Sequence, residues 1–94
     1  MIVIAVKLVV AESDAAAFEA RLKQHAANSL TQEGCKGFLV ARDQENPGAF
    51  QLWESYTDMA AFEEHKAADF MADFREFSTP MINERVLAIC DQIA

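Results

Sequence analysis

The stretch that decides the fold is CKGFLVARDQENPGAFQLWESY, which spans residues 35–56. Two of its segments, Cys35–Asp43 and Phe50–Tyr56, are rich in apolar and aromatic side chains, a composition typical of β-strands. The residues between them include Asn-Pro-Gly, which is a strong signal for chain reversal. The sequence therefore predicts a β-hairpin in the middle of the chain.

The residues before this hairpin predict a strand followed by a helix. Ile2–Val10 reads IVIAVKLVV and is apolar on both alternating faces, which indicates a largely buried strand. Either Ser13 or Asp14 can cap a helix that runs to about Glu33, and Gly34 is the expected stop at its C-terminal end.

The residues after the hairpin predict a broken helix and a last strand. Thr57 or Asp58 can cap a helix whose apolar pattern changes phase after Ala67, and a shorter helix then continues until Pro80 ends it. Arg85–Ile93 is again apolar on both faces and predicts the last strand.

The resulting order, β-α-β-β-α-β, is that of the α+β, ferredoxin-like split β-α-β arrangement. Its four-stranded antiparallel sheet carries helices on one face only. We interpret residues 1–94 as a single domain. Helices of this total length cover only one side of such a sheet, so the apolar opposite side would be exposed in a monomer. We therefore expect a homodimer that packs through the open sheet face.

Composition narrows the classes of partner. Fifteen acidic residues against eight basic ones give a net charge of −7, which disfavours nucleic acid and acidic membrane surfaces. The longest apolar run, Met1–Val6, is too short to span a bilayer and lacks the features of a secretory signal. Cys35 and Cys90 suggest neither a disulfide framework nor metal-ligand spacing, so we expect a cytoplasmic protein with no metal site.

Two histidines are the first candidates for chemistry. His25 lies at the edge of the apolar arc of the first helix, where it could bond a nearby carbonyl or serve a cavity between helix and sheet. His65 lies on the flank of its helix near the C-terminus, where it could respond to the helix dipole or belong to a site.

The other candidates are aromatic or acidic. Trp53 is either a core or interface residue or the wall of a ligand site. Glu54 shares a strand face with apolar side chains, so it lies at a wet strand end or is a buried carboxyl with a raised pKa that could act as a base. Phe38, Phe70 and Phe74 are core residues or the lining of an apolar pocket.

The pattern W-E-x-Y-x-D-x-x-A-x-x-x-H, from Trp53 to His65, resembles the antibiotic biosynthesis monooxygenase family of dimeric α+β barrels. The likeness extends over nearly the whole chain, from the opening strand at Met1–Val10 to Phe70–Arg85. Members of this family include quinol and polyketide monooxygenases, haem-degrading enzymes and an isomerase of a phosphorylated sugar. The resemblance implies a small aromatic or quinol substrate, with His65 and His25 as candidates for proton transfer. It also implies that Trp53, Glu54, Phe38, Phe70 and Phe74 contact the substrate.

Departures from the family pattern separate its branches. Val6 and Phe74 stand where haem-degrading members carry Asn and His, so the resemblance implies no haem. Asp69 stands where the isomerase and many quinol-type members have a second histidine. Lys36 and Gly37 follow Gly34, where the isomerase carries an arginine for its phosphate.

Three functions remain open on these residues. The first is a monooxygenase that needs no cofactor, because a deprotonated phenol or quinol can itself reduce dioxygen. The second is an isomerase of a small metabolite, phosphorylated or not. The third is a dimeric ligand-binding or stress-response protein without turnover. Convergence of His25 and His65 on one cavity would favour an enzyme. A cluster of Lys36, Arg42 or Arg85 in that cavity would favour a phosphorylated ligand, whereas a cavity lined only by Phe and Met would favour a quinol.

Overall fold

The computed structural model describes residues 1–94 and confirms the α+β, ferredoxin-like fold. Its four strands form one sheet in the order β2-β3-β1-β4, in which every neighbouring pair is antiparallel. In chain order the elements are β1 (Ile2–Val10), a short 3-10 turn (Glu12–Asp14), α1 (Ala15–Leu30), β2 (Cys35–Arg42), β3 (Ala49–Tyr56), α2 (Met59–Ala67), α3 (Asp69–Ser78) and β4 (Ile82–Asp91).

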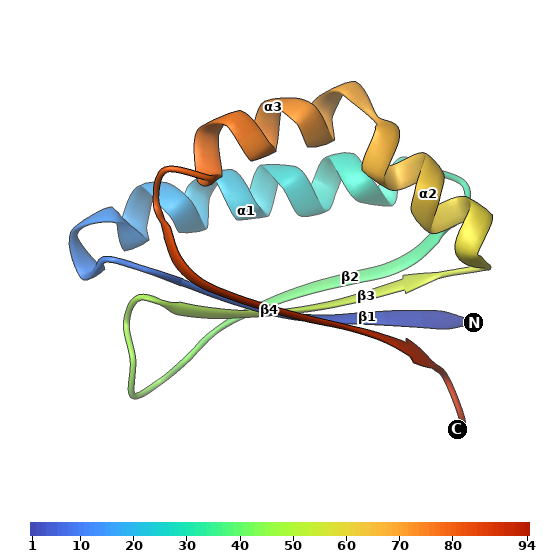
Figure 1. The fold of residues 1–94 in the computed structure, drawn as a ribbon, viewed down its shortest axis with the longest axis horizontal. Coiled ribbons are helices and arrows are strands. Elements are labelled where there is room, and N and C mark those ends of the chain that lie inside the picture. The colour runs from blue at the N-terminus through green and yellow to red at the C-terminus, as the bar shows by residue number, and fades with distance from the viewer.

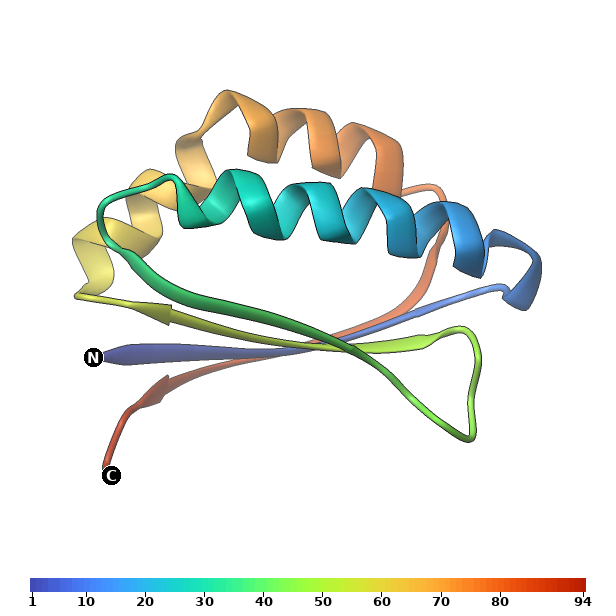
Figure 2. The ribbon, with the colours of Figure 1, turned by 180° about the vertical axis from the view of Figure 1, so that it is seen from behind.

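The molecule has two layers. All three α-helices lie on one side of the sheet, and both chain termini lie at the same end of it (Figure 1). The view from behind shows the opposite side of the sheet without any covering element (Figure 2). The core lies between the layers, where Ile4, Phe18, Leu22, Phe50 and Tyr56 are fully buried. Each such side chain stabilises the fold by roughly 1.5–3 kcal/mol through the burial of apolar surface.

The hairpin forms where the sequence predicts it, because its turn satisfies its own backbone groups. The Asp43 carboxylate accepts hydrogen bonds from the amides of Glu45 (2.8 Å) and Asn46 (3.0 Å), and the Asn46 side chain accepts one from Gly48 (3.2 Å). Such side-chain bonds hold tight turns in proteins. The turn sets the register that places Glu54 of β3 opposite Phe38 of β2.

The expected end of the first helix is wrong. Helix α1 ends at Leu30 instead of near Glu33, and Gly34 does not have the left-handed backbone of a helix stop. Gly34 has a different role: a Cβ atom there would overlap the Cβ of Ala61 in α2. The glycine therefore allows the start of β2 to approach α2 closely. The expected cap at Asp14 is also absent, since its side chain makes no capping hydrogen bond.

The break between the last two helices lies where the phase change predicts it. Asp58 caps α2 by accepting a hydrogen bond from the Ala61 amide (2.8 Å). Ala68 then adopts an extended backbone, so the chain turns before α3 begins at Asp69. This break redirects α3 along α1 (Figure 1).

The last strand differs from its expected bounds and burial. Strand β4 begins at Ile82, before the expected Arg85, because its pairing with β1 continues past a bulge at Val9 and Val10. It is an edge strand that the helix layer does not reach, so Leu87 and Ile89 are exposed on its helix-facing side.

The open side of the sheet is apolar. Leu39, Trp53 and Val86 are each more than half exposed there, around a shallow depression of about 380 Å³. None of the helices in the molecule combines the length and the apolar character that crossing a membrane requires.

Candidate functional site

A cavity of about 490 Å³, here called the central cavity, lies between the helix layer and the sheet. Just over half of its lining residues are hydrophobic. Its apolar walls come mainly from β1, β3 and α3 and include Ile4, Val6, Leu8, Leu52 and Phe74. Three titratable side chains that the sequence singled out also line it, namely His25, Glu54 and His65. A volume of this size suits a small organic ligand.

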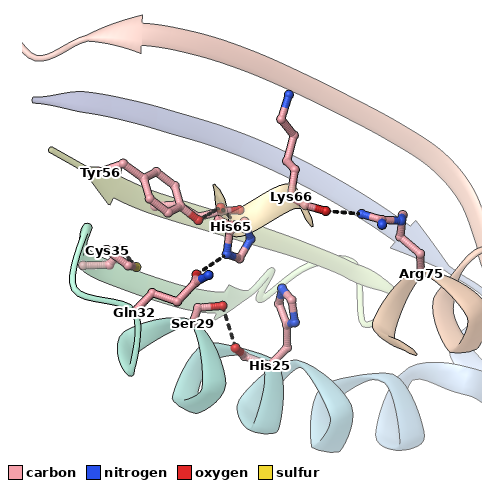
Figure 3. Close-up of polar contacts among 10 residues, drawn as sticks. His25, Ser29, Gln32, Cys35, Tyr56, His65, Lys66 and Arg75 are labelled. Atoms are coloured by element: carbon pink, nitrogen blue, oxygen red, sulfur yellow. Dashed lines mark hydrogen bonds and ion pairs between the residues drawn. The ribbon is translucent and has the colours of Figure 1, made fainter. Parts of the chain in front are cut away.

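His65 lies in the last turn of α2 and is 1% exposed. Its Nδ1 lies 2.9 Å from Gln32 Oε1 (Figure 3). An amide oxygen only accepts hydrogen bonds, so Nδ1 carries the proton and Nε2 presents a lone pair. This Nε2 is 3.9 Å from Glu54 Oε1. The contact with Gln32 therefore orients the imidazole so that its basic nitrogen faces the carboxyl group of Glu54.

Glu54 points from β3 toward the helices, because alternate residues of a strand face the same side. It is 6% exposed, and the Tyr56 hydroxyl donates a 2.7 Å hydrogen bond to its Oε1. Burial raises the pKa of the Glu54 carboxyl from its ordinary 4.5 to about 7, although the Tyr56 hydrogen bond and the charge of Arg85 partly oppose this rise. Of the two interpretations of Glu54, the buried carboxyl is the one that the structure supports.

His25 of α1 is buried next to His65, with the two ring centroids 5.6 Å apart (Figure 3). Its ring stacks on Phe74 at a centroid distance of 4.3 Å. Its backbone carbonyl accepts a 2.7 Å hydrogen bond from the Ser29 hydroxyl, whereas no carbonyl is found bonded to its ring. His25 lines both the central cavity and a smaller cavity of about 90 Å³ next to Phe70. It therefore has the position expected for a histidine that serves a cavity.

Burial keeps both imidazoles neutral. Desolvation, followed by the nearby His65 and Arg21, lowers the pKa of His25 from 6.5 to about 4. Desolvation, followed by Arg75, lowers the pKa of His65 to about 4 as well. At pH 7 the site thus combines two neutral imidazoles with a carboxyl group near its midpoint of ionisation, an arrangement that suits the acceptance and return of protons.

The predicted aromatic residues divide between two places. Phe74 lines the central cavity, and Phe38 and Phe70 lie 5.5 and 5.6 Å from the His25 ring, measured between centroids. Trp53 is not brought to this site. Strand alternation directs its side chain to the open face of the sheet, where it is 53% exposed.

Some residues of the site were not anticipated from the sequence. Tyr56 shares a strand face with Glu54, and that spacing of two could have indicated the contact. Gln32 is far from His65 in the sequence, and no local pattern connects the two. Arg85 lines the central cavity together with Arg75 and Lys66, whereas Lys36 and Arg42 do not. No group of three or more His, Cys, Asp or Glu side chains converges as metal ligands would.

The fold and this cavity define a small ferredoxin-like α+β protein whose internal cavity is lined by two histidines and a buried glutamate. The chain belongs to the antibiotic biosynthesis monooxygenase family, whose model matches residues 1–77. No match was found among curated proteins.

Solved structures share the fold. A candidate antibiotic biosynthesis monooxygenase from Nitrosomonas europaea is 21% identical, with a TM-score of 0.95 and full coverage of both chains. A second candidate from Caulobacter crescentus is 23% identical, with a TM-score of 0.92 over 99% of this chain and 90% of that one. A third from Deinococcus radiodurans is 19% identical, with a TM-score of 0.92 over 100% and 94%. At these identities the likeness establishes the fold alone.

Proposed function

We propose that this protein is a monooxygenase that needs no cofactor and acts on a small phenol or quinol in the central cavity. The observation that carries the proposal is the meeting of the His65 Nε2 lone pair and the Glu54 carboxyl at a cavity in which just over half of the lining residues are hydrophobic. Exclusion of water makes such a pair effective, because charges interact more strongly in a medium of low dielectric constant.

The proposed reaction begins with proton transfer. His65 Nε2 accepts the proton of the substrate hydroxyl, and the ionised Glu54 beside it stabilises the imidazolium that forms. The electron-rich anion then reduces dioxygen, and a C–O bond forms at a ring carbon. The ring C–H proton leaves, the O–O bond breaks, and the products are a quinone and one water. The substrate supplies all the electrons, so the balance needs no further reductant.

The surrounding aromatic side chains position the substrate in this proposal. Phe74 forms part of the cavity wall, and Phe38 and Phe70 hold the His25 ring through edge and tilted contacts. His25 is the second candidate for proton transfer, because its ring lies beside that of His65 and borders two cavities. It offers a route by which a proton leaves the site after each turnover.

A second candidate function is isomerisation of a small oxygenated metabolite. The observation that favours it is the pairing of a neutral imidazole with a carboxyl group whose pKa is about 7. One group can remove a proton from carbon while the other donates a proton to oxygen. Such a reaction would exchange substrate hydrogen with solvent deuterium and would consume no oxygen.

The test is oxygen uptake by the pure protein with simple quinols and naphthols. We expect uptake well above the autoxidation blank, a loss of at least tenfold in His65→Ala, and a smaller loss in His25→Ala. Lys36→Gln is the matched control, since Lys36 lies outside the cavity. Uptake no greater than the blank would refute the oxygenase. Deuterium exchange would then favour the isomerase, and its absence would favour a binding protein without turnover.

We further propose that the protein is a homodimer whose protomers meet through the open sheet face. Trp53, Leu39 and Val86 support this, because they form an apolar surface that a monomer would expose to water. Sedimentation velocity tests the proposal. A sedimentation coefficient of a 10.4 kDa monomer at micromolar concentration would contradict it.

A further inference from the structure

Only some of the basic residues of this acidic chain form salt bridges. The carboxylates of the chain form salt bridges with four of them, Lys7, Lys23, Arg42 and Lys66. The other four, which are Arg21, Lys36, Arg75 and Arg85, have no carboxylate within 4.0 Å, although acidic residues outnumber basic ones by fifteen to eight. Of these four, Arg75 and Arg85 line the central cavity.

The two arginines reach the cavity from different elements. Arg75 comes from the last turn of α3, and one of its five N–H groups donates to the Lys66 carbonyl at 3.2 Å (Figure 3). Arg85 comes from the helix-facing side of β4, opposite Leu8 of β1. Ser78 lines the cavity beside them and is 3% exposed. Two guanidinium groups without a carboxylate partner therefore line the same cavity.

In the sheet register the backbone of Arg85 is offset from that of Glu54. Arg85 is opposite Leu8, whereas Glu54 is opposite Ile4 on the same strand β1. Four residues of strand correspond to about 13 Å of backbone at 3.3 Å per residue. The long side chains reach across this offset: the charge of Arg85 opposes the rise in the pKa of Glu54, and Arg75 bonds the carbonyl of the residue that follows His65. The cavity thus presents two guanidinium groups within electrostatic reach of Glu54 and His65.

We propose that the ligand of this cavity carries, in addition to its reactive hydroxyl, an acidic oxygen group that Arg85 and Arg75 recognise. A guanidinium group binds carboxylates and other oxyanions through paired hydrogen bonds, and these two exposed arginines line one cavity, so they can attract an anion together. This inference rests on the proposed function only in placing the ligand in the same cavity.

The test measures binding without turnover, by calorimetry under anaerobic conditions at pH 7. The probes are 6-hydroxy-2-naphthoate, with its two groups at opposite ends, 3-hydroxy-2-naphthoate, with adjacent groups, and neutral 2-naphthol. We expect both hydroxynaphthoates to bind at least tenfold more tightly than neutral 2-naphthol. A sulfonate in place of the carboxylate distinguishes a tetrahedral from a planar oxyanion.

Substitutions test whether the two arginines cause the tighter binding of the carboxylate. Arg85→Gln should weaken 6-hydroxy-2-naphthoate at least tenfold and change 2-naphthol less than twofold, and Arg75→Gln should act in the same direction. Lys36→Gln removes an equal charge outside the cavity and should leave all three affinities unchanged. Equal binding of the three probes, no binding of any, or an equal effect of Lys36→Gln would overturn the inference. Because oxygen uptake is not measured, failure here is distinguishable from failure of the oxygenase.

Discussion

Replacement of Glu54 by glutamine is expected to remove a pH-dependent loss of stability. The carboxyl is buried and has a pKa of about 7 in the folded protein, against an ordinary value of 4.5. Between these values the unfolded chain has released the proton that the folded protein still holds, so stability falls as pH rises. Glutamine keeps the shape and still accepts the Tyr56 hydrogen bond, but it does not ionise.

The size of the effect follows from the same two values. A tenfold difference in an ionisation constant corresponds to about 1.4 kcal/mol, so the interval from 4.5 to about 7 amounts to roughly 3 kcal/mol. Glu54→Gln should therefore gain roughly this much stability relative to the wild type as pH rises from 4.5 to 8. The gain should level off above about pH 7.5. Both proteins retain His25 and His65, so the contributions of these residues cancel in the difference.

The assay is urea denaturation of both proteins at a series of pH values and one fixed protein concentration, because the stability of a dimer depends on concentration. Glu64→Gln is the matched control, since Glu64 is exposed on α2 and makes no salt bridge. We expect the Glu64→Gln curve to run parallel to that of the wild type. A constant difference between Glu54→Gln and the wild type across this pH range would refute the reasoning.

Three further predictions concern single contacts. Tyr56→Phe removes a hydrogen-bond donor that favours the ionised Glu54 carboxylate, so the pKa of Glu54 should rise above 7 by about one. A ¹³C NMR titration measures this pKa, and an unchanged midpoint would contradict the prediction. Gly34→Ala should cost about 1–3 kcal/mol in urea denaturation, because its Cβ would overlap Ala61, and unchanged stability would disprove this packing. Trp53→Glu should convert the proposed dimer to a monomer in sedimentation velocity, and an unaltered coefficient would exclude Trp53 from the interface.

The sequence predicts the fold well where an element is held by contacts between residues that are close together in the sequence. The hairpin turn is held by Asp43 and Asn46 themselves, so its sequence carries the necessary information. Element ends that depend on distant contacts were predicted less well. Gly34 resembled a helix stop but serves the close approach of Ala61. Strand β4 begins at Ile82 because β1 continues to pair with it. The polar residues at the start of β4 do not by themselves indicate that this pairing extends so far.

The site was predictable only in part for the same reason. The alternation of Trp53 and Glu54 indicated that they face opposite sides of the sheet, and the helices cover the side of Glu54. The convergence of His25 and His65 depends on how α1 and α2 pack, which is a long-range property. The partnership of His65 with Gln32 joins residues that are 33 positions apart, beyond any local pattern.

The most direct test of the account is the pH dependence of kcat/KM for oxygen uptake with a naphthol or quinol, in the wild type and in Glu54→Gln. We expect the wild-type kcat/KM to rise with pH through a midpoint near 7, because ionised Glu54 stabilises the imidazolium of His65. Glu54→Gln should be at least tenfold slower above pH 8 and should lack this midpoint. The same profile and rate in both proteins would contradict the central role of Glu54 and His65.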